Sequence, residues 1–149
     1  MQQEQTMTKV DCSQVYVDTS TFSTSERTFD GAFAQVDIKS GELVEKGIMR
    51  RLSDNENKAF DGTKNSYVFT WSEDIPNHTW AFPSGCAAFY NSGLDADTNT
   101  RMVRFMSEDR FEIYAKRDIS AGEELTHTYK SLRWRDAFQD LYSDLIKDT

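Results

Sequence analysis

The chain has 149 residues, of which 38% are hydrophobic and 13% aromatic, and its net charge is −8 with a pI near 4.7. This length suits one domain with its own core, and the acidic balance argues against a direct nucleic-acid partner. No apolar run approaches the roughly 20 residues of a membrane span, and the polar start does not resemble a secretory signal. We therefore expect an intracellular protein that is not secreted and has no membrane partner.

The composition also argues against a metal centre. Cys12 and Cys86 are the only cysteines, too few for a zinc cluster, and we expect both to be reduced thiols. Asp95, Asp97 and Asn99 have the spacing of a calcium loop, but the positions that need glycine and glutamate carry other residues. The sequence therefore predicts no metal site.

In chain order, residues 1–12 are polar and predict a disordered N-terminal tail. Val15–Val17 is the first strand-like run, and residues 18–30 form a loop rich in Ser, Thr and Asp that approaches Gly31. Runs with β-branched and aromatic residues predict further strands at 41–52, 67–71, 80–82 and 101–106, of which 67–71 and 80–82 form a hairpin.

Two segments predict helical structure. Residues 85–91 combine small and aromatic side chains and predict a short buried helical turn. From Ser131 onward, apolar residues recur at intervals of four, three and four, which predicts an amphipathic helix with Ser131 as its N-cap. The apolar residues are Trp134, Phe138, Leu141 and Leu145. We expect one domain over residues 13–134 and a C-terminal helix over 135–149 that packs on it.

A short unit occurs twice, at 33–43 and at 114–125. Aromatic-Ala, Asp-Ile and Gly-Glu recur in it at a constant offset of 81 residues, which indicates an internal repeat. Each copy predicts a strand, a tight turn whose glycine takes positive φ, and a second strand. The predicted fold class is therefore mainly β, or β-rich α+β.

The motif order of this chain resembles the SET domain of protein-lysine methyltransferases, in the small SET-only form of viral, phage or bacterial members. The resemblance covers roughly Val15 to Trp134. It rests on three motifs: Phe29-Asp30-Gly31-Ala32-Phe33-Ala34, then Asn91-Ser92-Gly93 with Ala96-Asp97, then Glu124-Leu125-Thr126-His127-Thr128-Tyr129. It implies a β-clip of several small sheets, with a knot-like C-terminal part where the last two motifs meet.

The resemblance also implies a cofactor, S-adenosyl-L-methionine, and roles for individual residues. Tyr129 would be the catalytic tyrosine, and Phe89 and Tyr90 are candidates for the substrate channel. The implied cofactor-binding residues are Thr28, Phe29, Asp30, Gly31, Asn91, Ser92, Tyr129 and Trp134. No metal is implied.

Methyl transfer to an amine is an in-line displacement, so such an enzyme chiefly aligns the reacting atoms and excludes water. The lysine must lose its proton, and a desolvated channel beside a cationic sulfonium favours the neutral amine. A phenol such as Tyr129 orients the amine. The acidic chain predicts a basic, lysine-containing protein or peptide substrate, and a homodimer stays open.

Several positions depart from the family pattern. Phe29 and Ser92 replace a glycine and a histidine, Cys86 stands where related members often have tyrosine, and Thr128 replaces an acid. Two alternatives therefore stay open: a SAF-type β-clip binding module, which also carries the repeat motif, and a SET-like scaffold without activity. A general-base role for His127 is less favoured.

Overall fold

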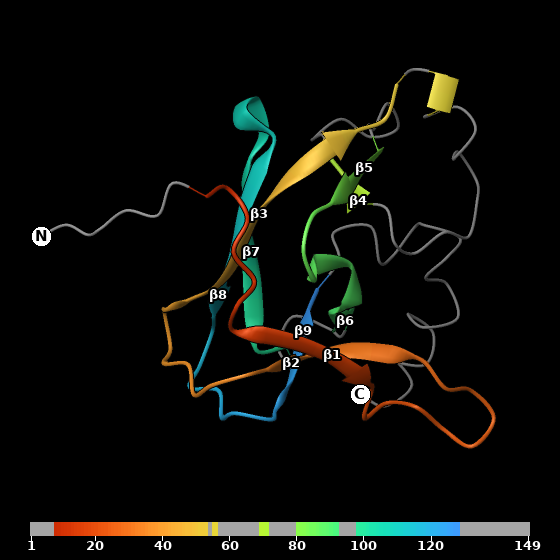
Figure 1. Ribbon diagram of the computed structural model, residues 1–149, viewed down its shortest axis with the longest axis vertical. Coiled ribbons are helices and arrows are strands. Elements are labelled where there is room, and N and C mark those ends of the chain that lie inside the picture. The colour runs from red at the N-terminus through yellow and green to blue at the C-terminus, as the bar shows by residue number, and fades with distance from the viewer. Residues whose placement is uncertain (1–7, 54, 57–68, 72–79, 93–97, 129–149) are drawn as a thin grey trace, which may run out of the picture.

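The computed structural model describes residues 8–53, 55–56, 69–71, 80–92 and 98–128, and in these ranges nine strands form two sheets (Figure 1). The first sheet has the strand order β1 (Val15–Thr19), β2 (Asp30–Ala34), β9 (Glu124–His127), β6 (Asn91–Ser92). The second has the order β4 (Phe69–Thr70), β5 (Trp80–Pro83), β3 (Leu43–Arg51), β8 (Arg110–Ala115), β7 (Thr100–Phe105). The prediction of a mainly β fold of small sheets is confirmed.

The first sheet has its small residues at the centre. β2 lies between β1 and β9 and pairs antiparallel with both. Gly31, Ala32, Phe33 and Ala34 of β2 are all buried, because neighbours cover both faces of this strand. β6 joins the far side of β9 in parallel, and this pairing brings the second and third motifs of the sequence side by side.

In the second sheet, buried and half-buried side chains alternate along β8 as expected, but this alternation is interrupted in β3. Phe111, Ile113 and Ala115 of β8 are buried and their neighbours are half-buried, as the period-two pattern predicts. In β3 a register shift between Leu43 and Glu45 marks a β-bulge. The bulge leaves two consecutive side chains buried, those of Val44 and Glu45.

The two repeat copies exchange contacts through their turns. Gly41 and Gly122 both have positive φ, 85° and 89°, which confirms the turn prediction. Asp37 of the first copy accepts a hydrogen bond from the Ala121 amide in the second turn, and Asp118 accepts one from the Ser40 amide in the first. Ile38 and Ile119 also pair through an antiparallel bridge. The shared Asp-Ile dipeptide of each copy therefore stabilises the turn of the other.

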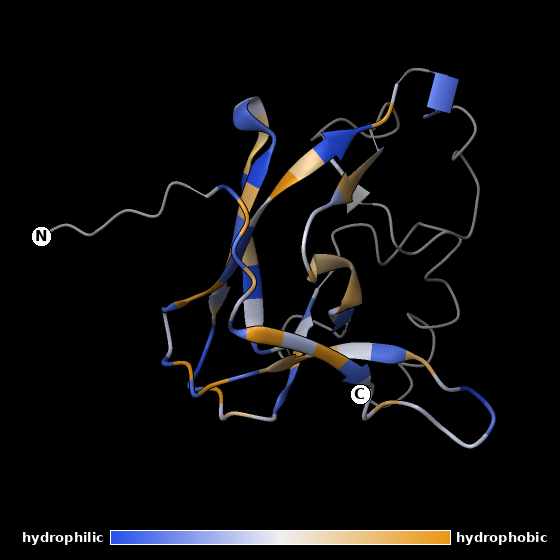
Figure 2. Ribbon diagram, in the orientation of Figure 1, coloured by the Kyte–Doolittle hydropathy of each residue, from blue (hydrophilic) through white to orange (hydrophobic). Residues whose placement is uncertain are grey.

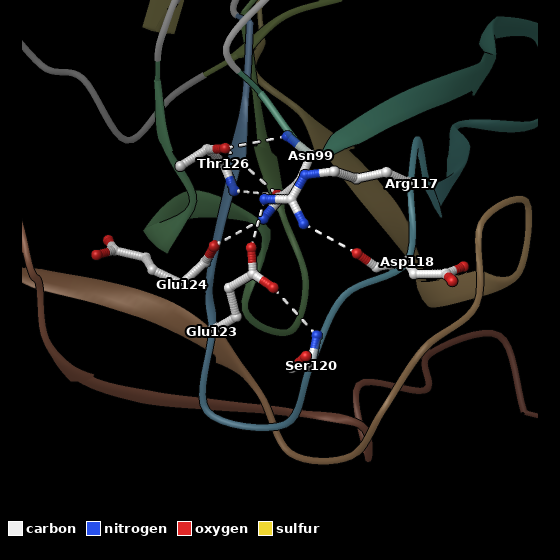
Figure 3. A network of polar contacts seen from close by, with 7 residues as sticks. All are labelled: Asn99, Arg117, Asp118, Ser120, Glu123, Glu124 and Thr126. Atoms are coloured by element: carbon white, nitrogen blue, oxygen red, sulfur yellow. Dashed lines mark hydrogen bonds and ion pairs between the residues drawn. The ribbon is translucent and has the colours of Figure 1, made fainter.

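The segment that precedes β7 is fastened to β9, as Figure 3 shows. The Asn99 side chain donates to the Glu124 carbonyl at 2.9 Å and accepts from the Thr126 amide at 2.8 Å. Thr100 Oγ1 donates to the Thr126 carbonyl at 2.8 Å. β9 therefore lies between β2 and β6 within its sheet and is also held by residues 99–100. The knot-like C-terminal part stays a prediction, because the chain from residue 129 onward lies outside the described residues.

Two 3₁₀ turns complete the described elements: η1 (Ala87–Phe89), the predicted helical turn, and η3 (Met106–Glu108). Asp109 after η3 has a φ of 50° and bonds Arg51 at 2.7 Å, which holds the outer end of β3. Figure 2 shows this end as hydrophilic and the middle of β3 as hydrophobic. The β4–β5 hairpin is antiparallel as predicted.

Some predictions lie outside the described residues. They concern residues 1–7 of the tail, the segment from 129 onward, and therefore the C-terminal helix. Residues 8–12 run against β3, where the backbones of Asp11 and Lys46 exchange hydrogen bonds of 3.0 and 3.1 Å. In the described ranges, none of the helical segments has the length and apolar character to span a membrane.

Candidate functional site

The structure brings the front and middle motifs together at Asn91. Asn91 begins β6, and its side-chain nitrogen donates to the Asp30 carbonyl at 3.2 Å and to Ser20 Oγ at 3.0 Å. Asp30 is exposed at the start of β2, whereas Gly31, the next residue, is buried. The implied cofactor-binding residues Asp30, Gly31 and Asn91 are therefore neighbours, although 60 positions separate Gly31 from Asn91 in the sequence.

The Glu124 carboxylate links these segments. It accepts hydrogen bonds from Asn91 Nδ2 at 2.9 Å, from Ser20 Oγ at 2.8 Å, and from both the amide and the hydroxyl of Thr21 at 2.8 and 2.5 Å. Glu124 is 8% exposed. Four donors satisfy the buried carboxylate, so it holds Ser20 and Thr21 of the loop against Asn91 of β6.

Gly31 allows the Glu124 carboxylate to lie directly against β2. A Cβ at position 31 would lie 2.2 Å from Glu124 Oε2 and 3.0 Å from Asn91 Nδ2. Any side chain there would displace the carboxylate or Asn91. The glycine of the front motif is therefore required by close approach of side chains rather than by a positive φ.

Thr28 and Phe29 lie in the loop between β1 and β2, which extends away from the sheets (Figure 1). The Phe29 carbonyl accepts from the Ser20 amide at 2.8 Å, and the Phe29 amide donates to Ser23 Oγ at 3.1 Å. Thr28 is exposed. The base of the loop is thus closed by the Ser20–Phe29 backbone bond and by the Ser23 hydroxyl, and Ser20 also accepts from Asn91.

Ser92 is half-buried and pairs with His127 across the parallel β6–β9 ladder. His127 is buried and stacks on the Tyr90 ring, with the ring centroids 5.6 Å apart. Burial, and then the nearby Arg104, lower the pKa of His127 to about 3. A neutral imidazole with so low a pKa is a weak base, which disfavours a general-base role.

The candidate channel residues Phe89 and Tyr90 precede Asn91 directly. Phe89 is half-buried, whereas Tyr90 is 1% exposed and donates its hydroxyl to Glu45 Oε1 at 2.7 Å. Burial, and then the Glu45 carboxylate, raise the pKa of Tyr90 well above its usual range, so the phenol stays protonated. In this structure Tyr90 is part of the core beneath Asn91.

Cys86 does not have the properties of a nucleophile. Both cysteines of the chain are free thiols. Burial, and then the charge of Glu45, raise the pKa of Cys86 to about 12, and the thiol is far less reactive than a thiolate. This environment gives no support to covalent catalysis by cysteine.

The polar groups around Asn91 satisfy one another. The Glu124 carboxylate, the Asp30 carbonyl and the Ser20 hydroxyl all accept hydrogen bonds from the Asn91 side-chain nitrogen. No group of three or more metal-ligating side chains occurs in the part of the chain that the structure describes.

Tyr129 and Trp134 lie outside the described residues, so their assigned roles stay predictions. Ser20, Thr21 and Glu124 also belong to the site, although the sequence motifs did not indicate them as site residues. Nothing in a loop rich in Ser and Thr distinguishes Ser20 from its neighbours. Glu124 did offer a signal, because a carboxylate that begins a short buried strand needs donors from elsewhere in the fold.

Two small sheets, a repeat that exchanges turn contacts and a strand fastened by the segment before β7 define a SET-type β-clip. The family comparison gives the same class, because the model of the SET domain matches residues 30–130. The chain therefore belongs to the SET domain family.

The similarity extends to curated and solved proteins. A Schizosaccharomyces pombe histone-lysine N-methyltransferase specific for H3 lysine 4 is 32% identical over 67% of this chain, which spans 11% of that protein. A Plasmodium falciparum structure assigned as a histone methyltransferase has a TM-score of 0.55 and 17% identity, and covers 82% of this chain and 97% of its own. Chaetomium thermophilum polycomb repressive complex 2 bound to S-adenosylmethionine has a TM-score of 0.60 and 24% identity, over 90% of this chain and 16% of its own. The two structures support the fold.

Proposed function

We propose that this protein transfers a methyl group from S-adenosyl-L-methionine to the side-chain amine of a protein lysine. The observation that carries the proposal is the position of Asn91, which lies between the glycine of the front motif and the strand of the last motif. Membership of a family whose curated relatives include histone-lysine methyltransferases supports the same reaction.

When bound, the cofactor supplies an electrophilic methyl group. On this proposal Asn91, with the backbone at Thr28–Gly31, binds its methionine end, Ser92 offers backbone groups to the adenine, and Trp134 stacks on the ring. The Glu124 carboxylate keeps Asn91 in place through the 2.9 Å hydrogen bond. Tyr129 orients the lysine nitrogen, Phe89 excludes water from its path, and Tyr90 supports Asn91 from the core.

The acidic composition supports a basic substrate segment. The chain has 25 acidic and 17 basic side chains, and opposite charge chiefly raises the rate of encounter. We expect kcat/KM for a basic, lysine-containing peptide to fall as salt rises, because screening at about 0.15 M salt already acts beyond roughly 8 Å. A flat salt profile, or a preference for acidic peptides, would contradict a charge-steered substrate.

Calorimetry with S-adenosylmethionine and S-adenosylhomocysteine tests the function most directly. Both ligands should bind, and both should raise the melting temperature, because a ligand that binds only the native state stabilises it by mass action. Asn91→Ala should weaken binding by at least about tenfold, the loss expected from one or two hydrogen bonds. Glu112→Gln on β8, far from Asn91 in the strand order, is the control and should bind as the wild type does.

Activity separates an enzyme from a scaffold that retains the cofactor. Tyr129→Phe should bind S-adenosylhomocysteine normally and lose turnover by about 100-fold, the effect of removing one positioned polar group. Wild-type protein that binds the cofactor but methylates neither basic peptides nor histones would favour the scaffold, an alternative that the Ser92 and Thr128 departures keep open. No binding at all would refute the proposal.

A further inference from the structure

Glu45 is a buried carboxylate that has no role in the function proposed above. It lies in β3, and its side chain is 1% exposed. Regular alternation would point Val44 and Glu45 to opposite faces, but the bulge between Leu43 and Glu45 turns both inward. A carboxylate placed in a core by a bulge is costly unless it binds specific partners.

Its partners are the two ends of the turn η1. Glu45 Oε1 accepts from the Tyr90 hydroxyl at 2.7 Å, and Oε2 accepts from the Cys86 amide at 3.2 Å. Cys86 is the N-cap of η1 and makes no side-chain capping bond, and Tyr90 is its C-cap, whose amide donates to the Ala87 carbonyl. One carboxylate from a distant strand therefore holds both ends of this turn.

Gly85 allows the backbone before η1 to approach the Glu45 carboxylate closely. Its φ is +65°, and a Cβ there would lie 2.7 Å from Glu45 Oε2. The backbone before the turn thus takes a conformation that brings it directly against the carboxylate. The contact between Glu45 and the segment 85–90 is close at three successive points, at Gly85, Cys86 and Tyr90.

The turn leads directly into the candidate cofactor site. Tyr90 is followed by Asn91 and Ser92, which make up the whole of β6. A strand of two residues has few ladder bonds of its own, so the position of its first residue depends on the backbone that precedes it. The Glu45 carboxylate holds this backbone through its bonds to Cys86 and Tyr90.

We propose that Glu45 is a positioning residue for the methyl donor: by binding both ends of η1 it sets Asn91 and Ser92, and thereby the affinity for the cofactor. This inference rests on the proposed function for its ligand. The structural link from Glu45 to Asn91 does not rest on the proposed function, because it is a property of the protein without cofactor.

The link depends on pH. Desolvation by burial raises the pKa of Glu45 to about 7, although the bonds from Tyr90 and Cys86 lower it. A protonated carboxyl loses one of the two acceptor oxygens that hold the turn, so cofactor affinity should fall as pH falls through 7. Among the residues that the structure describes, the titratable groups around Glu45 are Asp11 and Cys12 from the N-terminal segment, Cys86 and Tyr90 from the turn, and His127, which stacks on Tyr90.

The test follows the Asn91 and Ser92 amide resonances of the free protein from pH 5.5 to 8.5. The same samples give the affinity for S-adenosylhomocysteine by calorimetry. We expect both resonances to shift with a midpoint near 7, and the affinity to fall about tenfold from pH 8.5 to 5.5. In Glu45→Gln, which keeps the shape and cannot ionise, the resonances and the affinity should not change around pH 7.

Glu112→Gln is the matched control. Glu112 on β8 also accepts a hydrogen bond from a tyrosine, Tyr114, but makes no bond to the segment 85–92. Its replacement should leave the pH profile unchanged. If Glu45→Gln does not fold, the wild-type titration alone decides, together with Tyr90→Phe, which should move the midpoint of the Asn91 shift.

Flat Asn91 and Ser92 resonances in the wild type overturn the inference, as does a midpoint near 7 that persists in Glu45→Gln. Resonances that titrate as expected without any S-adenosylhomocysteine binding support the link from Glu45 to Asn91 and refute the methyltransferase function instead. Binding with flat resonances refutes the link alone.

Discussion

Two buried carboxylates support Asn91, one directly and one through the residues before it, and different sets of donors bind them. Glu124 accepts four hydrogen bonds from Ser20, Thr21 and Asn91 and is 8% exposed. Glu45 accepts two and is 1% exposed. For Glu45, desolvation outweighs its hydrogen bonds and the pKa rises to about 7.

The difference indicates that Glu124 and Glu45 support Asn91 in two different ways. Glu124 binds the Asn91 side chain itself, through a set of donors that neighbouring segments supply. Glu45 binds only the backbone and side chain of the residues before Asn91, with fewer donors and a proton that can be exchanged near neutral pH. The first contact fixes the site, and the second makes its position sensitive to pH.

The largest effect should come from Glu124→Ala. This change removes the acceptor of four donors in a buried place, and we expect a loss of about 4 kcal/mol in the free energy of unfolding. Urea denaturation measures it. Glu123→Ala is the control, because the partly exposed Glu123 pairs with Arg117 and accepts from the Ser120 amide, and its loss should cost about 1 kcal/mol. Equal losses for the two variants would remove the special role of Glu124.

The second prediction concerns stability against pH. Glu45 holds its proton up to about pH 7 in the folded state and only to about 4.5 when unfolded. The folded state therefore binds more protons between these values, and its stability falls as pH rises. Relative to Glu45→Gln, the wild type should lose about 3 kcal/mol between pH 4.5 and pH 8. A constant difference across this range would show that Glu45 is ionised throughout.

The third prediction compares two glycines. Gly31→Ala places a Cβ 2.2 Å from Glu124 Oε2, and we expect a loss of about 2 kcal/mol together with weaker cofactor binding. Gly41→Ala meets no atom within 4 Å but has a φ of +85°, so it should cost about 1 kcal/mol and leave binding intact. Thermal denaturation and calorimetry measure both. Normal cofactor binding by Gly31→Ala would separate Glu124 from the site.

The smallest effect is expected at Ser92, the residue after Asn91. If the adenine is bound through the backbone here, Ser92→Ala should weaken S-adenosylhomocysteine binding by at most about 1 kcal/mol, the typical value of one neutral hydrogen bond. Calorimetry at pH 8 provides the value. A much larger loss would show that the hydroxyl does the work of the histidine that relatives of this family carry.

The sequence predicted most of the strands, the repeat and its turn glycines, because alternation and the Gly-Glu dipeptide are local signals. It placed Asn91 in a helical turn, whereas Asn91 begins β6, because a strand of two residues shows no alternation. It also predicted that the middle and last motifs meet, through the resemblance. It could not predict that Glu45 points inward, because the pattern of apolar and polar residues over Leu43–Arg51 gives no sign of the bulge. The donors to Glu124 were missed for a similar reason: Ser20 and Thr21 are more than 100 positions from it, and nothing local pairs them.

The exchange of contacts between the two repeat copies has a consequence for the order in which the chain folds. The turn at Gly41 receives its aspartate from residue 118, and β2 and β3 pair with β9 and β8. A nascent chain that has emerged only as far as β7 can pair β1 with β2 and β3 with β5, but it lacks the second neighbour of β2 and of β3. Pairing between such distant segments is slow, and we expect both sheets to be completed only after β8 and β9 have left the exit tunnel.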